Sequence, residues 1–206
     1  LKNLETLVRK NVSRFWKNNL IVINKFATPE NINSLLDDNN FQNDIDLFSI
    51  DIDGIDYWII KKLKKNISKI FIAEFNPVFG SDLKVTVPNI DGFDRTKYHY
   101  SNLCYGMSLR ALIELMNEKN YYFIGTNLQK MNAFFISKDF SKEDYFENLE
   151  INSLEVYTDS NIRDSRDRNH NLNYLSGQNK IKEISDCEVI NLANNEHDLV
   201  KIKDLI

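Results

Sequence analysis

Apolar positions in the first third of the chain alternate between helical spacing and short continuous runs. Spacings of three and four residues predict an amphipathic helix over residues 4–15, and further helices after Pro29 and after Gly54. The predicted strands are residues 20–23, 46–50 and 67–75. Helices that alternate with strands apolar on both faces are typical of a parallel sheet covered by helices. The sequence therefore predicts an α/β fold.

The middle of the chain has a different pattern. Residues 78–105 lack a clear period, and so long a loop in a compact domain usually serves as a lid or a substrate-binding segment. A helix is expected from Leu109. The two apolar runs at 121–125 and 133–136 predict an antiparallel pair at the edge of the sheet.

The last quarter of the chain is polar and rich in Asn and Asp. We expect a partial Rossmann-like domain over residues 1–149 and a polar C-terminal extension over 150–206 that packs on it. One short helix is expected in this extension, near residues 178–184.

Net charge, cysteine spacing and the length of the apolar runs limit the classes of partner to be expected. Net charge is −4 without a long block of Lys or Arg, which argues against a nucleic-acid partner and favours a small-molecule substrate. Cys104 and Cys187 have no metal-ligand spacing, as expected of reduced thiols in a cytoplasmic protein. No apolar run is long enough to span a membrane and no secretory leader is evident, so no membrane partner is expected.

Acidic residues follow two of the predicted strands. In an α/β sheet, ligands bind beyond the carboxyl ends of the strands, so Ala27-Thr28, Asp51–Asp53 and Glu74–Asn76 should line one crevice. Asp51 and Asp53 are two residues apart on a strand and point the same way. They could act as a catalytic base with its partner or share a divalent metal ion, or one could cap the next helix while the other meets solvent.

Glu74 and His99 are further candidates for the site. Glu74 ends an apolar strand, where a carboxylate must reach the crevice or pair with a lysine. His99 follows Tyr98 on the expected lid, where it could act as a general base, stack against a substrate or be purely structural.

Several segments, taken in order, resemble a subgroup of FkbM-type methyltransferases. The matching segments are Phe48–Trp58, Ile72–Pro77, Tyr105–Leu109, Asn132–Ile136, Ser165–Asp167 and Tyr174–Gly177. The resemblance covers nearly the whole chain. Each segment alone is a weak signal, and the ordered set is more specific.

This resemblance implies a class I methyltransferase fold, with a Rossmann-like sheet that is mostly parallel and a last strand that runs antiparallel. It implies S-adenosylmethionine as cofactor and methyl transfer to an oxygen of a sugar or secondary metabolite. The residues expected to contact the cofactor are Ala27, Thr28, Ser49 and Asp51. The residues expected to contact the substrate are Asn76, Tyr98 and Tyr105. The catalytic candidates are Asp51, Asp53, Glu74 and His99, with Asp51 and Asp53 also expected at any metal ion.

The chain departs from the family at its start. The family's first strand, its glycine-rich cofactor loop and the acidic end of its second strand would all precede Leu1. With only 6 glycines, the chain offers no other glycine-rich loop. The expectation is therefore a fold whose N-terminal strands are missing from this sequence.

Three other functions remain open. Asp51 to Gly54 after an apolar strand is also typical of haloacid-dehalogenase-like phosphatases, although Ile55 stands where Thr or Val is needed. An Asp-x-Asp glycosyltransferase would use the same pair to hold a metal-bound nucleotide sugar. A degenerate methyltransferase domain that acts as a non-catalytic module would account for the missing cofactor loop.

Overall fold

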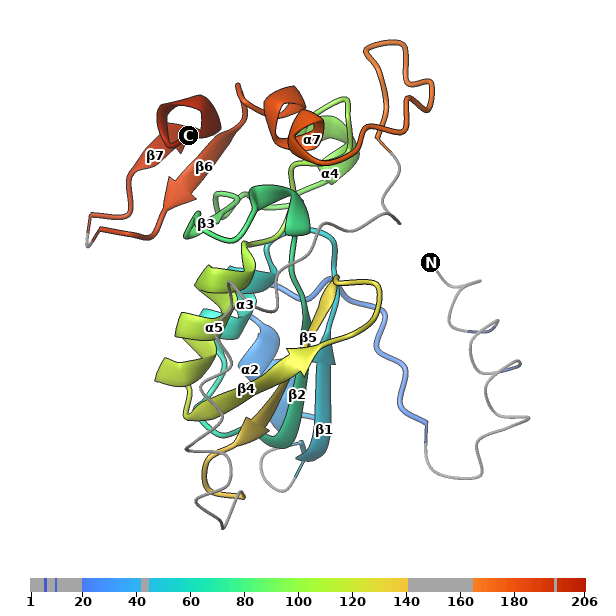
Figure 1. Cartoon of the computed structure of the whole chain (residues 1–206). Helices are drawn as coiled ribbons and strands as arrows, with labels where there is room; N and C mark the ends of the chain where they lie inside the picture. The colour runs from blue at the N-terminus through green and yellow to red at the C-terminus, as the bar shows by residue number, and fades with distance from the viewer. Residues whose placement is uncertain (1–5, 7–9, 11–19, 42–44, 141–164, 195) are drawn as a thin grey trace.

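The computed structural model describes residues 6, 10, 20–41, 45–140, 165–194 and 196–206. Within these residues the chain is α/β, with a four-stranded mixed sheet and a second, three-stranded antiparallel sheet (Figure 1). The predicted fold class is thus confirmed at the level of α/β. The predicted N-terminal helix over residues 4–15 lies almost entirely outside the described residues.

The larger sheet has the order β1-β2-β5-β4. Its strands are β1 (Ile45–Ile50), β2 (Ser68–Glu74), β4 (Tyr121–Thr126) and β5 (Asn132–Ser137). The β1–β2 pairing is parallel, and β5 pairs antiparallel with both β2 and β4. Three of these strands therefore run in one direction and β5 in the other. One of the three strand pairings is parallel and two are antiparallel, so the sheet is mixed. The expected mostly parallel pairing is therefore not found among the described strands.

The predicted hairpin of β4 and β5 is confirmed, with β4 at the edge of this sheet. The register shifts between Phe123 and Gly125, where Gly125 has a φ of 138°. A β-bulge of this kind bends an edge strand away from regular pairing.

The strand predicted at residues 20–23 is wrong. These residues belong to no strand, and Ile21 and Ile23 are 51% and 41% exposed. The expected series of three consecutive parallel strands is therefore reduced to the pair β1 and β2. Propensity favoured a strand, but tertiary pairing decides whether an apolar run joins a sheet.

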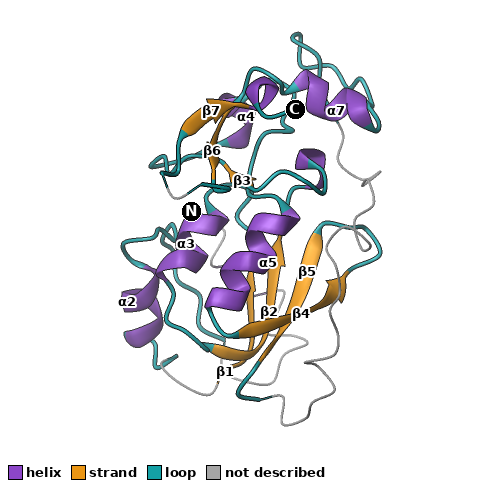
Figure 2. Cartoon of the chain, turned by 60° about the vertical axis from the view of Figure 1, so that its left-hand side comes forward, coloured by secondary structure: helices purple, strands orange, loops and turns teal. Residues whose placement is uncertain are grey.

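Helices α2 (Ile32–Asp37), α3 (Asp56–Lys62) and α5 (Leu109–Glu118) lie on one face of this sheet (Figure 2). The buried side of α5 carries Leu109, Leu112 and Met116 at helical spacing, which explains why this segment is a helix. These side chains join Phe71 and Phe135 from the sheet in one hydrophobic core.

The second sheet joins two distant parts of the chain in the order β3-β6-β7. Its strands are β3 (Val85–Thr86), β6 (Glu188–Asn191) and β7 (Leu199–Lys201). The predicted C-terminal helix is confirmed as α7 (Gln178–Glu183), and η2 (Ile202–Asp204) follows β7. The segment predicted as one long loop also contains η1 (Pro77–Phe79) and α4 (Arg95–Tyr98).

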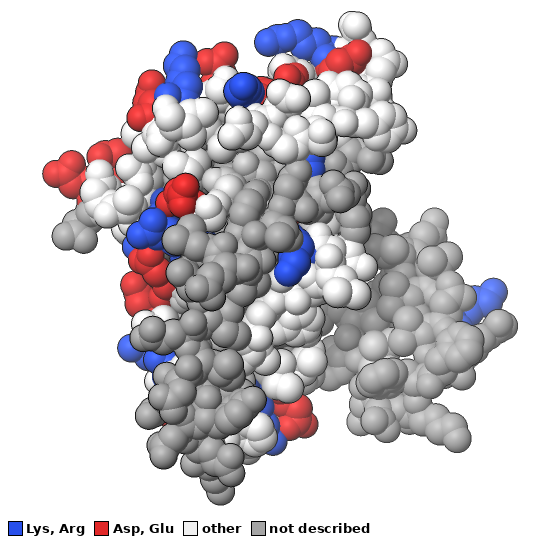
Figure 3. Space-filling model, viewed as in Figure 1, with Lys and Arg blue, Asp and Glu red and all other residues white. Residues whose placement is uncertain are grey.

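Charged side chains of both signs are interspersed over the face of the molecule shown in Figure 3. None of the helices in the described part of the chain is long and apolar enough to cross a bilayer.

Candidate active site at the ends of β1 and β2

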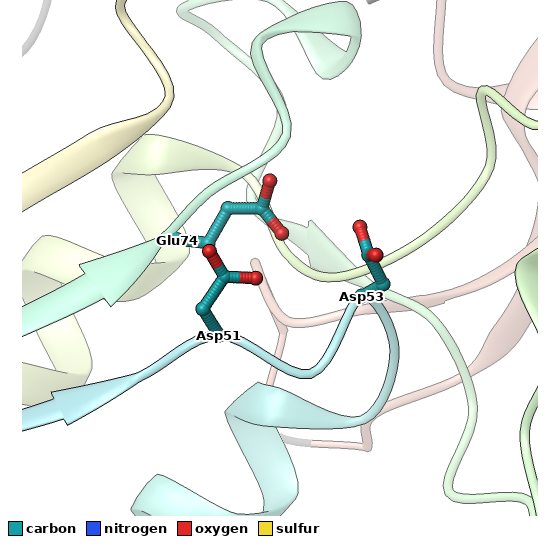
Figure 4. A group of neighbouring side chains, drawn as sticks. All are labelled: Asp51, Asp53 and Glu74. Atoms are coloured by element: carbon teal, nitrogen blue, oxygen red, sulfur yellow. The ribbon is translucent and has the colours of Figure 1, made fainter. Parts of the chain in front are cut away.

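Three carboxyl groups meet where β1 and β2 end. Asp51 and Asp53 follow β1, and Glu74 is the last residue of β2. Because the two strands are parallel and in register, with Ile50 opposite Ala73, their carboxyl ends lie side by side. One oxygen from each of the three side chains lies within 4.8 Å of the others, and Figure 4 shows the group as it converges. The predicted convergence of Asp51, Asp53 and Glu74 is confirmed.

A fourth carboxylate, that of Asp56, shapes the turn that presents the cluster. Asp56 is only 1% exposed and accepts hydrogen bonds from the backbone N–H groups of Ile52 and Gly54, each at 3.0 Å. These bonds hold the turn in which Asp53 has a φ of 54°, a left-handed conformation that is uncommon for residues other than glycine. We did not predict this role, although an acidic residue at the start of an apolar helix is a visible signal.

Gly54 is required by close packing in the same turn. A Cβ atom there would stand 2.9 Å from Cδ1 of Phe93. The carbonyl of Gly54 also accepts a hydrogen bond from the N–H of Gly106 at 3.0 Å. The turn is thus fixed against Phe93 of the predicted lid and against Gly106, which directly follows it.

Arg95 is the cation of the site, and no local sequence signal indicated it. Its guanidinium group donates to Oδ1 of Asp53 at 2.8 Å and lies over the ring of Tyr105, 5.4 Å from the centroid. Tyr105 is 1% exposed, and burial, followed by the neighbouring carboxyl group of Glu74, raises the pKa of its phenol. The predicted substrate residue Tyr105 therefore lies beside the acidic cluster, beneath Arg95.

The acidic cluster holds a proton at neutral pH. Burial, followed by the negative charges of Asp51, Asp53 and Asp56, raises the pKa of Glu74 to about 9, while Arg95 opposes the shift. A hydrogen bond joins the carboxyl groups of Asp51 and Glu74. Burial and the charge of Asp53 also raise the pKa of Asp51, although this residue keeps an exposed surface. The arrangement combines a carboxylic acid with carboxylates that can accept a proton.

The side-chain amide of Asn76 forms its hydrogen bonds with backbone groups of the protein. Its side chain is fully buried, and Nδ2 donates to the carbonyls of Leu103 at 2.8 Å and Tyr105 at 2.9 Å. Its Oδ1 accepts from the N–H of Val78 at 3.0 Å. In this structure Asn76 ties the end of β2 to the 103–105 segment rather than presenting its amide to a ligand.

A pocket of about 930 Å³ opens beside the cluster. Residues 26–30, 52–55, 89 and 91–97 line it. Ala27 and Thr28 lie on its wall together with Asp53, as the crevice prediction required, even though the described residues 20–26 before them form no strand. Asp51, Glu74 and Asn76 do not belong to this lining.

The other candidates lie apart from the cluster. Ser49 is exposed on β1 opposite Ile72. The hydroxyl of Tyr98 donates to the carbonyl of Glu188 in β6 at 2.7 Å. His99 shares a 2.7 Å hydrogen bond with Ser101, and burial lowers the pKa of its imidazole, whose charged neighbours are Glu183, Arg168 and Asp186. The structure thus turns Tyr98 and His99 toward the C-terminal segment.

Two kinds of chemistry fit this site. Carboxylates beside a pocket can accept a proton from a bound hydroxyl group. Three carboxyl oxygens so close together can also coordinate a divalent cation, which would displace the shared proton. Comparisons with protein-family models, with curated proteins and with solved structures return no match for this chain.

Proposed function

We propose that this chain belongs to an S-adenosylmethionine-dependent methyltransferase that methylates a hydroxyl oxygen of a sugar or secondary metabolite. The observation that carries the proposal is the convergence of Asp51, Asp53 and Glu74 beside a pocket that also includes Ala27 and Thr28. The direction of β5, against the other strands of its sheet, is the arrangement that the sequence resemblance implies.

The lining of the pocket is compatible with such a donor. S-adenosylmethionine would supply an electrophilic methyl group on a positively charged sulfur. The pocket is lined by four acidic and two basic residues, so its net charge is negative and favours a cation. Its volume lies in the range of small-molecule sites. Ala27 and Thr28 would contact the adenine end. Ser49 and Asp51, the other cofactor contacts that the resemblance implies, do not line this pocket.

The chain's own carboxylates would serve the acceptor. Asp53 lines the pocket, so its carboxylate could accept the proton of the acceptor hydroxyl directly. Asp51 does not line the pocket, but one of its carboxyl oxygens lies within 4.8 Å of one of Asp53, so it could receive that proton in turn. Glu74, being protonated, donates to Asp51 and keeps two adjacent negative charges from facing each other. Arg95 holds Asp53 in position. General-base assistance of this kind contributes about 100- to 10,000-fold to a rate.

The test begins with the reading frame upstream of Leu1. A glycine-rich strand–loop–helix there supports the proposal, and its absence favours a non-catalytic module. Calorimetry of the protein from the complete reading frame should detect binding of S-adenosylmethionine. In that protein, Asp51→Ala and Asp53→Ala should lower methyl transfer to a pool of hydroxylated acceptors by about two to four orders of magnitude. Wild-type turnover in both variants would remove these carboxylates from the mechanism.

A second candidate is an Asp-x-Asp glycosyltransferase, because the three clustered carboxyl oxygens are suited to a metal ion. In that case Mn²⁺ should raise the melting temperature of the wild-type chain at pH about 8, and the rise should be lost in Asp53→Asn. Uridine diphosphate should add to the Mn²⁺ effect. If Mn²⁺ acts equally on both proteins, this candidate is excluded.

A further inference from the structure

The chain has two cysteines, and the fold brings them together although they lie far apart in the sequence. Cys104 lies near the end of the segment predicted as a lid, and Cys187 directly precedes β6. A hydrogen bond joins their thiol groups, so the two sulfur atoms are in contact. Both thiols are free, and the exposed fraction is 0% for Cys104 and 6% for Cys187. Contact between the sulfur atoms is the first condition for a disulfide bond.

The backbone on both sides of the pair is held by hydrogen bonds that do not involve sulfur. Nδ2 of Asn76 donates to the two carbonyl groups that flank Cys104, at 2.8 and 2.9 Å. The hydroxyl group of Tyr98 donates at 2.7 Å to the carbonyl of Glu188, the residue after Cys187. These bonds place the two cysteines opposite each other independently of their thiols. A disulfide would therefore add a covalent bond to a contact that the fold already makes.

The two thiols differ in their ability to react with a small disulfide. The hydrogen bond to Cys187, followed by burial, raises the pKa of the Cys104 thiol well above its ordinary value, so Cys104 keeps its proton. Cys187 is also the one with exposed surface. Because the thiolate is the attacking form and needs access to its target, Cys187 is expected to react first.

We propose that Cys104 and Cys187 form a reversible disulfide by exchange with a low-molecular-weight disulfide such as oxidised glutathione. The sulfur of Cys187 attacks one sulfur of oxidised glutathione, the disulfide bond of glutathione breaks, and one reduced glutathione leaves. The sulfur of Cys104 then attacks the sulfur of Cys187 and releases the second glutathione. The two protein thiols are oxidised, the glutathione disulfide is reduced, and the two thiol protons pass to the released glutathione molecules.

This bond would fasten the second sheet to the segment that supports the acidic cluster. It closes a loop of roughly 80 residues, and a cross-link over a loop of that length strongly restricts the unfolded chain. Tyr105 is the next residue after Cys104, and its ring lies beneath Arg95. Neither cysteine is among the described residues that line the pocket at Asp53. The inference is therefore independent of the proposed methyl transfer.

The experiment exposes the folded chain to excess oxidised glutathione at about pH 8 for a day, with circular dichroism as the check that it stays folded. The sample is then acid-quenched and unfolded, and its free thiols are counted. We expect both thiols to be lost without bound glutathione, and peptide mass spectrometry to find Cys104 linked to Cys187 within one chain. The oxidised chain should melt at least about 5 °C above the reduced chain, and dithiothreitol should reverse the difference.

Two single variants are the matched controls. Cys104→Ala should stop at a mixed disulfide between Cys187 and glutathione, because the second attacking sulfur is missing. Cys187→Ala should melt at the same temperature in oxidising and reducing buffer. Two free thiols in the folded wild-type chain after this treatment would overturn the inference. A persistent glutathione adduct on the wild type, or a disulfide between two chains in place of one within the chain, would also overturn it.

Discussion

The proton held by Glu74 should make the folded chain less stable as pH rises. Its pKa lies near 4.5 in the unfolded chain and about 9 in the folded one, so the folded state binds this proton more tightly. A raised carboxyl pKa contributes stability that is complete below about pH 4.5 and is lost progressively as pH rises toward 9. One proton corresponds to about 1.4 kcal/mol of unfolding free energy per pH unit, so by pH 7 the loss reaches up to about 3 kcal/mol.

Glu74→Gln tests this reasoning, because its neutral amide imitates the protonated acid. We expect the variant to lack this part of the pH dependence and to be the more stable protein above about pH 7. Urea unfolding at about pH 5, 6.5 and 8 measures the difference in slope. Glu118→Gln, at an exposed position on α5, is the control and should follow the wild type. If wild type and Glu74→Gln lose stability in parallel over this range, the carboxyl group of Glu74 is not protonated in the folded chain.

Three further predictions concern the frame of the site. Asn76→Ala leaves two buried carbonyls and one N–H without their partner, so urea unfolding should show a loss of about 2–4 kcal/mol. Gly54→Ala should cost about 1–3 kcal/mol by overpacking against Phe93, and Phe93→Leu should recover part of that loss in a double-mutant cycle; simple additivity would contradict the contact. Arg95→Gln removes the charge that lowers the pKa of Glu74, so carbon-13 NMR should find the carboxyl group of Glu74 titrating at higher pH than in the wild type. An unchanged midpoint would refute the electrostatic effect of Arg95 on Glu74.

Local patterns predicted the elements that bury a regular face. The periodicity of α5 and the apolar run of β2 were sufficient, because burial of these positions is what makes the segments regular. β1 was predicted as well, although Ile50 is its one buried residue. The same reasoning failed at residues 20–23, which have strand composition but form no ladder among the described residues. A strand is completed by its neighbour, and the sequence of one run does not specify that neighbour.

In the candidate site, too, some residues could be predicted from the sequence and others could not. Asp51, Asp53 and Glu74 could be predicted because parallel strands deliver their ends to one edge. Arg95 could not, since it reaches Asp53 from the short helix α4, 42 positions away along the chain. The aromatic cluster at Tyr98 and His99 was expected to face the site. Hydrogen bonds to Glu188 and Ser101, together with charges in the C-terminal segment, determine its orientation instead.

The second sheet has a consequence for how the chain is made. β3 precedes its partner β6 by a long stretch of sequence, so the ladder between them can form only after β6 has been synthesised. During translation the four-stranded sheet can assemble first, whereas Val85 and Thr86 of β3 have no strand to pair with until β6 is made. Helix α4, which carries Arg95 and is bonded through Tyr98 to the carbonyl of Glu188, therefore gains this support only after β6 has left the ribosome.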